Sequence, residues 1–236
     1  MSRYSKVLLK LSGESLGGPK GVGLDSSVLN EYARQITSIV KSGTAVALVV
    51  GGGNIFRGLS GAGKGFDRVR GDQMGMLATV INSIALSMSI RSLGIECEVY
   101  TSTPMEPFAR YYVRDIAISL MNKGGVAIIA GGTGNPFFTT DSASALRAAE
   151  LGVCALLKGT RVDGVYDCDP EKNPKAIKFK TLTYDIALAK NLKIMDQTAF
   201  SLCKENDVPI VVFDMNTSGN LEKIVEGQDI GTVIGL

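Results

Sequence analysis

Short apolar runs of β-type composition alternate with segments of helical periodicity along most of this chain. The runs that we predict as strands are Val7–Leu11, Ala45–Val50, Ile95–Thr101, Val126–Ala130, Val153–Leu157 and Pro209–Phe213. The main predicted helices are Ser26–Lys41, Asp72–Leu93, Arg110–Met121 and Asp141–Leu151, and two further helical stretches flank the last strand. Buried apolar strands that alternate with helices are typical of parallel sheets covered on both faces. We therefore expect an α/β fold whose mainly parallel sheet is sandwiched by helices.

Length and composition set the scale of this fold. The chain has 236 residues, of which 45% are hydrophobic and 20% are charged, so it can bury a sizeable core and is not expected to be disordered. It shows no low-complexity linker and no repeat of fixed period. The segment Asp167–Lys180 is rich in Pro, Lys and Asp, which indicates an exposed loop or hairpin. We predict one domain with lobes, spanning residues 1–236.

The residue types also exclude several classes of function. Histidine is absent, which rules out Ser-His-Asp and Cys-His catalysis, histidine general bases and histidine metal ligands. The net charge of +2 gives no reason to expect a nucleic-acid partner. The cysteines show no C-x-x-C spacing, so we interpret them as reduced, mostly buried thiols of an intracellular protein; they are Cys97, Cys154, Cys168 and Cys203.

No segment is expected to target or anchor the chain in a membrane. Lys10 interrupts the first apolar run and no small-residue cleavage site follows, so we do not predict a signal peptide. The least charged stretch, Met74–Ile90, is slightly too short to span a bilayer and contains Asn82. We predict that it forms a helix buried on most sides, and a helix of this kind also suggests a contact with a second subunit.

Three predicted strands end in glycine-rich, polar sequence. The first runs into Lys10–Ser15 (KLSGES), the second into Gly51–Gly58 (GGGNIFRG), and the strand Val126–Ala130 into Gly131–Thr140 (GGTGNPFFTT). Bare glycine backbone and helix N-termini both favour a bound anion, and ligands of parallel sheets bind beyond the carboxyl ends of the strands. One such loop would most simply be a tight turn, but the three together predict a polyphosphate site.

Another glycine-rich segment does not fit a known phosphate motif. Gly58–Gly65 (GLSGAGKG) nearly matches the P-loop pattern, but Gly65 follows Lys64 where that motif needs a Ser or Thr hydroxyl for magnesium. No predicted strand directly precedes it, and it lacks the spacing of a dinucleotide fingerprint. We interpret it as a flexible basic loop and do not expect NAD binding.

Six segments together carry a resemblance to a known family. They read LLKLSGE, GGGNIFRG, GDQMGMLATVIN, GTGNPFFTTDSA, GTRVDGVYDCDP and LKIMDQTAF. The chain resembles the bacterial-type uridylate kinases of the amino acid kinase superfamily from about Lys6 to its C-terminal end, and GTGNPFFTTD is the most specific part. The resemblance implies a three-layer amino acid kinase-like domain and ATP- and magnesium-dependent phosphorylation of UMP to UDP for pyrimidine nucleotide synthesis. It further implies a cytoplasmic enzyme that is usually hexameric, with no nucleic acid or membrane partner.

The resemblance also implies which residues bind ATP. Lys10, Leu11, Ser12 and Gly13 would cradle the ATP phosphates, with the Lys10 ammonium stabilising the transferring group. Gly53 and Arg57 would contact ATP, and Thr160, Tyr166 and Asp169 match the loop around adenine and ribose. Each has a simpler interpretation: Lys10 as a strand lysine that reaches solvent, Arg57 as a surface charge, and the last three as turn residues, with Asp169-Pro170 starting the turn.

UMP would bind at a second set of loops. By resemblance Gly52 contacts the acceptor and Asp72 its ribose, although Asp72 could equally be the N-cap of the predicted helix. The acceptor segment would be Thr133, Gly134, Asn135, Pro136, Phe137, Phe138, Thr139 and Thr140. Its phenylalanines could form an apolar wall or a core contact.

The expected chemistry needs little covalent help from the protein. Phosphoryl transfer to an ionised phosphate requires positioning and neutralisation of charge, so the missing histidines are no obstacle. The resemblance assigns Asp141 to orienting the catalytic lysines and gives Asp196 a related part, while a plain helix-dipole contact is the alternative for Asp141. Magnesium would be held mostly by phosphate oxygens and water, and we predict no protein ligand.

Other functions and one departure from the family stay open at this point. A superfamily kinase acting on a carboxylate or carbamate should lack the PFFTT segment, whereas a non-catalytic nucleotide-binding or storage protein would not need Lys10, Arg57, Asp72 and Asp141. In the family, GTP activates through a pocket partly built from arginines on the buried helix and the strand after it. The matching positions here hold Ser87, Met88 and Glu98, so whether GTP activates this chain stays open.

Overall fold

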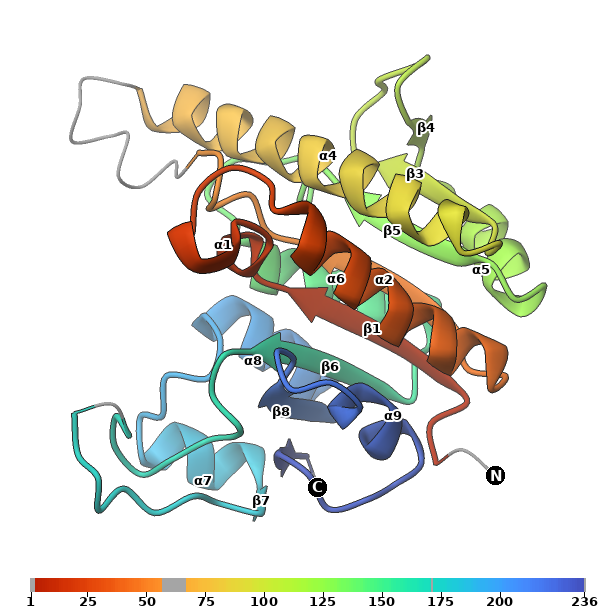
Figure 1. Ribbon diagram of the computed structural model, residues 1–236. Helices are drawn as coiled ribbons and strands as arrows, with labels where there is room; N and C mark the ends of the chain where they lie inside the picture. Colours follow the sequence, from red (N-terminus) through yellow and green to blue (C-terminus); the bar gives the residue numbers. More distant parts are fainter. Residues whose placement is uncertain (1–2, 57–66, 171, 236) are drawn as a thin grey trace.

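A single nine-stranded sheet runs through the part of the chain that the computed structural model describes, residues 3–56, 67–170 and 172–235 (Figure 1). Its strand order is β4-β3-β5-β2-β1-β6-β8-β9-β7. All the pairings are parallel except β8 with β9. The strands are β1 (Lys6–Leu11), β2 (Ala45–Val50), β3 (Cys97–Thr101), β4 (Arg110–Tyr111), β5 (Val126–Ala130), β6 (Ala155–Thr160), β7 (Thr181–Leu182), β8 (Ile210–Asp214) and β9 (Thr232–Ile234). The predicted α/β class and mainly parallel sheet are confirmed.

Helices cover both faces of the sheet. They are α1 (Gly13–Leu16), the 3₁₀ helix η1 (Gly18–Lys20), α2 (Ser26–Lys41), α4 (Arg68–Ser92), α5 (Arg114–Asn122), α6 (Thr140–Leu151), α7 (Tyr184–Ala189), α8 (Gln197–Glu205) and α9 (Asn220–Val225). One core cluster packs α2, α4 and α9 on the sheet, and a second packs α5, α6, α7 and α8 on the other face.

The period of two along the strands decides which side chains face which helices. In β1, Val7, Leu9 and Leu11 belong to the α2 side of the core, whereas Leu8 belongs to the α6 side. Because successive side chains alternate between faces, Lys10 projects toward α6 at the carboxyl end of the strand. The same alternation in β6 places Leu157 on the α2 side and Lys158 on the α6 side.

Most predicted elements lie within a few residues of the observed ones, but some differ. The predicted helix Arg110–Met121 is wrong at its start, because Arg110–Tyr111 pairs with β3 and the helix begins only at Arg114. The last three residues of β6 extend beyond the predicted strand Val153–Leu157. The described residues of Asp167–Lys180 form a mostly exposed loop, and an isolated antiparallel bridge joins Tyr166 to Lys178. Of the cysteines, Cys97 and Cys203 are buried but Cys154 and Cys168 are exposed, so "mostly buried" was wrong for half of them.

Helix α4 is buried on one side only. Its inner positions include Thr79, Asn82 and Leu86, but an apolar stripe on its outer side is exposed. This outer stripe consists of Met74, Leu77, Ile81 and Met88. The prediction of burial on most sides therefore does not hold for the isolated chain. The stretch predicted from the sequence, Met74–Ile90, is slightly too short to span a bilayer, but the observed helix has 25 residues and by length and composition could cross one. Core helices of soluble proteins have the same length and composition, so this is weak evidence for a membrane span.

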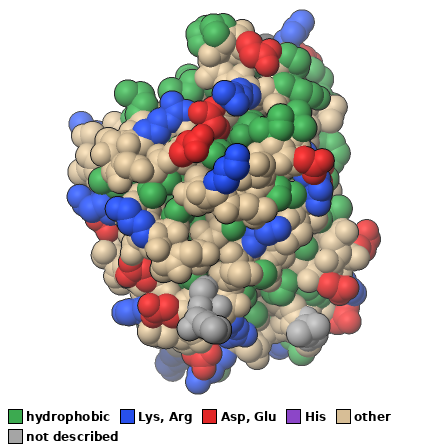
Figure 2. Space-filling model, turned by 90° about the vertical axis from the view of Figure 1, so that its right-hand side faces the viewer, with side chains coloured by type: hydrophobic (Ala, Val, Ile, Leu, Met, Phe, Trp, Pro, Cys, Tyr) green, Lys and Arg blue, Asp and Glu red, His purple; other side chains and the backbone are tan. Residues whose placement is uncertain are grey.

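The amino and carboxyl ends of the strands lie on opposite sides of the molecule and carry different side chains. The face turned to the viewer in Figure 2 lies at the amino ends of the strands, where acidic and basic side chains are interspersed among apolar and neutral ones. The carboxyl ends of β1, β2 and β5 meet at the opposite edge, where the glycine-rich loops gather.

Candidate active site

The three glycine-rich strand ends come together because β5, β2 and β1 are neighbours in the sheet. The loops after β1 and β2 touch: Gly51 N donates to Leu11 O at 2.9 Å, and a Cβ at position 13 would lie 2.4 Å from Gly51 O. Any side chain larger than hydrogen at Gly13 would force the two loops apart. The predicted adjacency of these strand ends is confirmed.

A buried pair of amides fixes this contact. Asn82 on α4 donates to Gly51 O at 2.6 Å and to Asn54 Oδ1 at 2.7 Å. Asn54 donates in return to Asn82 Oδ1 at 3.0 Å and to Gly23 O at 2.6 Å. Both asparagines are buried, so the bonds satisfy groups that would otherwise be costly to desolvate. The sequence analysis did not identify this pair.

Two lysines and an aspartate form the charged centre of the site. Lys10 and Lys158 are register partners on the parallel strands β1 and β6 and face the same side. Asp141, in the first turn of α6, lies between them: its Oδ1 is 2.8 Å from Lys10 Nζ and its Oδ2 is 2.8 Å from Lys158 Nζ. Lys158 also donates to Ile194 O at 2.6 Å. The lysines are therefore held as a pair with a single carboxylate between them.

Burial and pairing act against each other in this cluster. Burial alone would raise the pKa of Asp141, but the charges of Lys10 and Lys158 outweigh it and hold that pKa below its usual value. Burial lowers the pKa of Lys158, and the attraction of Asp141 only partly restores it. The carboxyl group is therefore ionised at neutral pH and cannot serve as a proton acceptor there without giving up two ion pairs.

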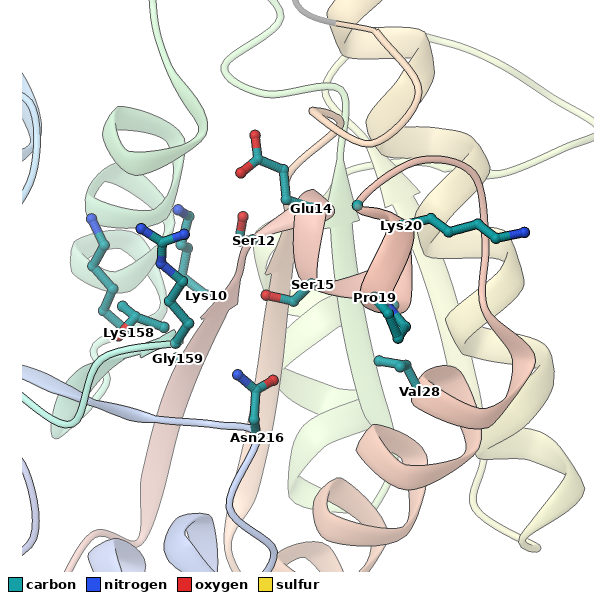
Figure 3. Close-up of a pocket in the computed structure, with 14 residues that line it drawn as sticks. Lys10, Ser12, Glu14, Ser15, Pro19, Lys20, Val28, Lys158, Gly159 and Asn216 are labelled. Atoms are coloured by element: carbon teal, nitrogen blue, oxygen red, sulfur yellow. The ribbon is translucent and has the colours of Figure 1, made fainter. Parts of the chain in front are cut away.

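The lysines open onto a cavity of about 760 Å³ at the carboxyl ends of β1 and β6. Figure 3 shows Lys10 and Lys158 side by side on one side of it, with Ser12, Ser15 and Glu14 facing the same space from the start of α1. Gly159 and Asn216 also line the cavity, as do Pro19, Lys20 and Val28 (Figure 3). A cationic wall next to a glycine-rich helix start suits a polyphosphate.

A second cavity of about 530 Å³ adjoins the first through Lys158 and Thr160, which line both. It also contains Tyr166 and Asp169, so the residues predicted to surround adenine and ribose do lie around one space. Some of their groups also have local roles: the Thr160 hydroxyl donates to Val162 O at 2.6 Å. The predicted turn after Asp169 is present, since Asn173 N donates to Asp169 O at 2.9 Å.

The predicted acceptor segment is a tight loop between β5 and α6. Gly131, Gly132, Gly134 and Phe137 all have positive φ, and Gly134 N donates to Gly131 O at 3.0 Å. Positive φ at Phe137 is a strained conformation that the surroundings must stabilise. The loop therefore has a defined conformation, and groups outside the loop must stabilise it.

Helix α4 supplies two of those groups. The Thr79 hydroxyl accepts from Gly131 N at 2.8 Å, and Asp72 Oδ2 accepts from Phe137 N at 2.7 Å. Asp72 also pairs with Arg68, whose guanidinium lies 5.3 Å from the centroid of the Phe137 ring. The N-cap interpretation of Asp72 was wrong, because Asp67 caps α4 by accepting from Arg70 N.

The remaining loop residues separate into exposed and anchoring groups. Phe137 and Phe138 are 64% and 48% exposed, which excludes the core contact considered for them and leaves the apolar wall. Gly52 lies against α4, where an added Cβ would be 2.8 Å from Ala78 Cβ. The Thr133 hydroxyl accepts from Asn135 N at 3.2 Å and so closes the turn that contains Gly134 and leads into Pro136.

The end of the loop is joined to α8. Thr139 is the N-cap of α6, and its hydroxyl donates to the carboxylate of Asp196. Asp141 lies in the first turn of the helix, where the helix dipole favours a carboxylate. Asp196 also accepts from Ser142 Oγ at 3.0 Å and caps α8 through Ala199 N at 2.9 Å. Asp196 thereby orders the helix turn that carries Thr140 and Asp141, and Asp141 in turn contacts the lysines.

Three further predicted ATP contacts are Leu11, Gly53 and Arg57. The Leu11 side chain is buried in the core at 1% exposure, so only its backbone is available at the site. Gly53 lies in the turn after β2. Arg57 lies outside the described residues, as does the segment 58–65 that was predicted as a basic loop.

Lys158 was not predicted as a site residue. Its strand reads ALLKGT and so places a lysine after two leucines, just as VLLKLS does around Lys10.

The positions matched to the GTP pocket carry a different set of contacts. Glu98 pairs with Arg91 at 2.9 Å and with Arg110 at 3.5 Å beside a cavity of about 460 Å³ that Ser87 and Met88 also line. Arg91 and Arg110 also line this cavity, so Glu98 is held between two guanidinium groups there.

The chain is similar in sequence and structure to known kinases. Residues 5–214 match the model of the Amino acid kinase family. A curated uridylate kinase of Parabacteroides distasonis is 56% identical, and one of Bacteroides thetaiotaomicron is 57% identical, each over 99% of both chains. The crystal structure of UMP kinase from Bacillus anthracis superposes with a TM-score of 0.95 at 38% identity and covers 98% of this chain and 96% of its own. That of UMP kinase from Ureaplasma parvum gives 0.93 at 35% identity, covering 99% of this chain and 100% of its own. The chain therefore belongs to the amino acid kinase family, as a nucleoside monophosphate kinase of the bacterial-type uridylate kinase group.

Proposed function

We propose that the protein transfers the γ-phosphoryl group of ATP to UMP, forming ADP and UDP for pyrimidine nucleotide synthesis. The observation that carries the proposal is the Lys10–Asp141–Lys158 cluster, which opens onto the large cavity and lies at the start of the helix that follows the acceptor loop. The relatives that carry the name uridylate kinase and match over the whole chain support the choice of UMP.

The reaction needs one bond to form and one to break. A phosphate oxygen of UMP attacks the γ-phosphorus, and the bond from that phosphorus to the bridging oxygen breaks, so that the electron pair leaves with ADP. The negative charge spreads over the equatorial oxygens during transfer. Lys10 and Lys158 carry the opposite charge at that place, and Asp141 keeps both ammonium groups in position without drawing a proton from the acceptor.

Each substrate has its own set of residues. ATP would lie along Lys10–Gly13, Gly53 and Arg57, with its base near Thr160, Tyr166 and Asp169 in the second cavity. UMP would lie against Gly52, Asp72 and the loop 133–140, with Phe137 and Phe138 as an apolar wall. Asp196 would act on the reaction through Thr139 and the first turn of α6.

Magnesium would enter as part of the nucleotide. No group of three or more Cys, Asp or Glu side chains is placed to hold an ion among the residues that the structure describes, and the Asp141 carboxylate is engaged by two lysines. These observations fit an ion held by phosphate oxygens and water. Bound in that way, it would screen the charge of the phosphates, and no step is assigned to it.

The assembly and location follow from the same proposal. The exposed outer stripe of α4 is an apolar surface suited to burial against a second copy, and we propose a homo-oligomer, in keeping with the hexamers of the family. We further propose a single amino acid kinase-like domain over residues 1–236 that acts in the cytoplasm, with ATP and UMP as partners and neither nucleic acid nor membrane.

An acceptor panel tests the proposal. Purified protein with ATP and magnesium is assayed for ADP release with UMP, CMP, AMP, glutamate, aspartate and carbamate. UMP should react well and the others poorly, since each buried group left unpaired by the wrong base costs about 1–3 kcal/mol. Equal rates with UMP and CMP would make it a general pyrimidine monophosphate kinase. Turnover only with an amino acid would indicate another superfamily kinase, and ATP binding with no turnover would favour a storage protein.

A further inference from the structure

Helix α6 carries a second buried charge, two turns beyond Asp141. Arg147 is only 7% exposed, and its guanidinium makes contacts in three directions. Nη1 donates to Glu150 Oε2 at 2.7 Å, Nη2 donates to Ser102 Oγ at 3.1 Å, and the cation lies 4.3 Å from the centroid of the Tyr112 ring. A buried arginine is expensive to desolvate, so such a group needs a structural or functional reason.

The contact with Ser102 leads directly to the predicted acceptor loop. Ser102 follows β3, and its hydroxyl lies 2.7 Å from Gly132 O. A hydroxyl has one proton, so an oxygen that accepts from Arg147 is free to donate to Gly132. The relay therefore runs from Arg147 through Ser102 to the backbone of the loop.

Ser102 also supports this turn by close packing. Its backbone N donates to Ala130 O at 3.2 Å. A Cβ added at Gly131 would lie 3.3 Å from Ser102 N, and one added at Gly134 would lie 3.1 Å from Ser102 O. The first turn of the acceptor loop therefore rests on Ser102, and a shift of this residue would move the loop.

We propose that Arg147 is a positioning residue for the acceptor, acting through Ser102 on the turn Gly131–Gly134. The inference rests on the proposed function of that loop. A hydroxyl that accepts from a cation is a stronger donor to the next carbonyl than a neutral pair would be. Arg147 thus fixes the loop from the same helix that fixes the lysines through Asp141, which joins acceptor and reaction centre in one rigid element.

Kinetics of matched variants test the relay. Arg147→Met and Ser102→Ala should each raise KM for UMP by about tenfold, the scale of one lost charge-assisted bond, while KM for ATP stays within about twofold. Arg147→Lys should restore part of the UMP affinity. Because both residues act in series, the double variant should be no worse than the more affected single one. Arg114→Met is the control, since Arg114 donates to Glu150 O at the end of the same helix and to Asp115 Oδ1.

Backbone exchange gives a readout that needs no substrate. In the unliganded protein, amide hydrogen exchange at Gly131 and Gly134 should be faster in Arg147→Met and Ser102→Ala than in the wild type or Arg114→Met. Additive effects, equal changes in the two KM values, or unchanged exchange would overturn the inference. If Arg147→Met does not fold, Arg147→Lys and Ser102→Ala provide the same comparison. If the wild type does not phosphorylate UMP, the proposed function is wrong. Faster exchange at Gly131 and Gly134 in Arg147→Met and Ser102→Ala than in the wild type would still support the contact from Arg147 through Ser102 to the loop.

Discussion

The two halves of the site are held by different forces. On the donor side, Lys10 and Lys158 project from neighbouring strands and meet one carboxylate, and each lysine side chain is less than 15% exposed. On the acceptor side, single hydrogen bonds between its backbone and surrounding side chains hold the loop 131–139, and Phe137 is 64% exposed. Under the proposed function, the group that neutralises developing charge is held by ion pairs, while the surface that recognises the nucleotide is a strained loop supported from outside.

Helix α4 joins the two halves. Asn82 holds the loop after β2 against the loop after β1, and Thr79 and Asp72 hold the acceptor loop. These three polar side chains contact the loops, whereas the outer stripe of the same helix is apolar and exposed. A charge-based half and a hydrogen-bonded half should therefore respond differently to mutation, and the following experiments test that difference.

Removing a lysine should have the largest effect. Lys10→Ala or Lys158→Ala should lower kcat by roughly 10²–10³, the scale for losing one donor to developing charge. Lys6→Ala is the matched control, because Lys6 lies on β1 facing the same side but bonds Leu151 O at the other end of the strand. Near-normal kcat in a folded Lys10→Ala or Lys158→Ala variant would show that this lysine does not stabilise the developing charge.

Changing the acceptor side should act on binding instead. Asp72→Asn keeps the shape but weakens the bond to Phe137 N and the pair with Arg68, so KM for UMP should rise by about tenfold while kcat changes little. Steady-state kinetics at saturating ATP measure both. Asp67→Asn is the control, since Asp67 caps the same helix by accepting from Arg70 N. A loss in kcat as large as that of Lys10→Ala would erase the distinction between the two halves.

Much of this arrangement could be predicted from the sequence, and the failures have physical causes. The glycine-rich ends of three apolar strands indicated one edge of one sheet, because parallel strands present their carboxyl ends together. Lys10 was identified because the resembling segment LLKLSGE contains it, whereas Lys158 lies just before the segment GTRVDGVYDCDP. A lysine between apolar residues alone indicates only a side chain that reaches solvent. The start of α4 was misplaced because Arg68–Gly71 has no apolar periodicity, so Asp72 was taken for the cap instead of Asp67. The strands β9 and β7, which follow β8 in the sheet, are three and two residues long, which is too short for a pattern.

The outer stripe of α4 gives a smaller test. Wild-type protein should be larger than its 24.9-kDa chain by light scattering at micromolar concentration, and Leu77→Glu should shift it toward the monomer by placing a charge in the buried contact. Leu188→Glu on α7 is the control, because Leu188 is similarly exposed, 45% against 49% for Leu77. A wild-type monomer, or equal dissociation in both variants, would show that this stripe is not the contact.

The smallest effect is on stability, and it depends on pH. Lys10 and Lys158 hold the pKa of Asp141 below its usual value against the opposing effect of burial, so the folded state binds this proton less readily than the unfolded chain does. The ion pairs therefore stabilise the protein fully above the ordinary carboxyl pKa of about 4, and the contribution disappears as the pH falls through the folded-state value. Asp141→Asn resembles the protonated side chain at every pH. Urea unfolding should show the wild type more stable than Asp141→Asn at pH 7, with the two free energies of unfolding converging as the solution is acidified. A constant difference would mean that Asp141 stabilises the fold through packing, and that the donor side is not held by charge.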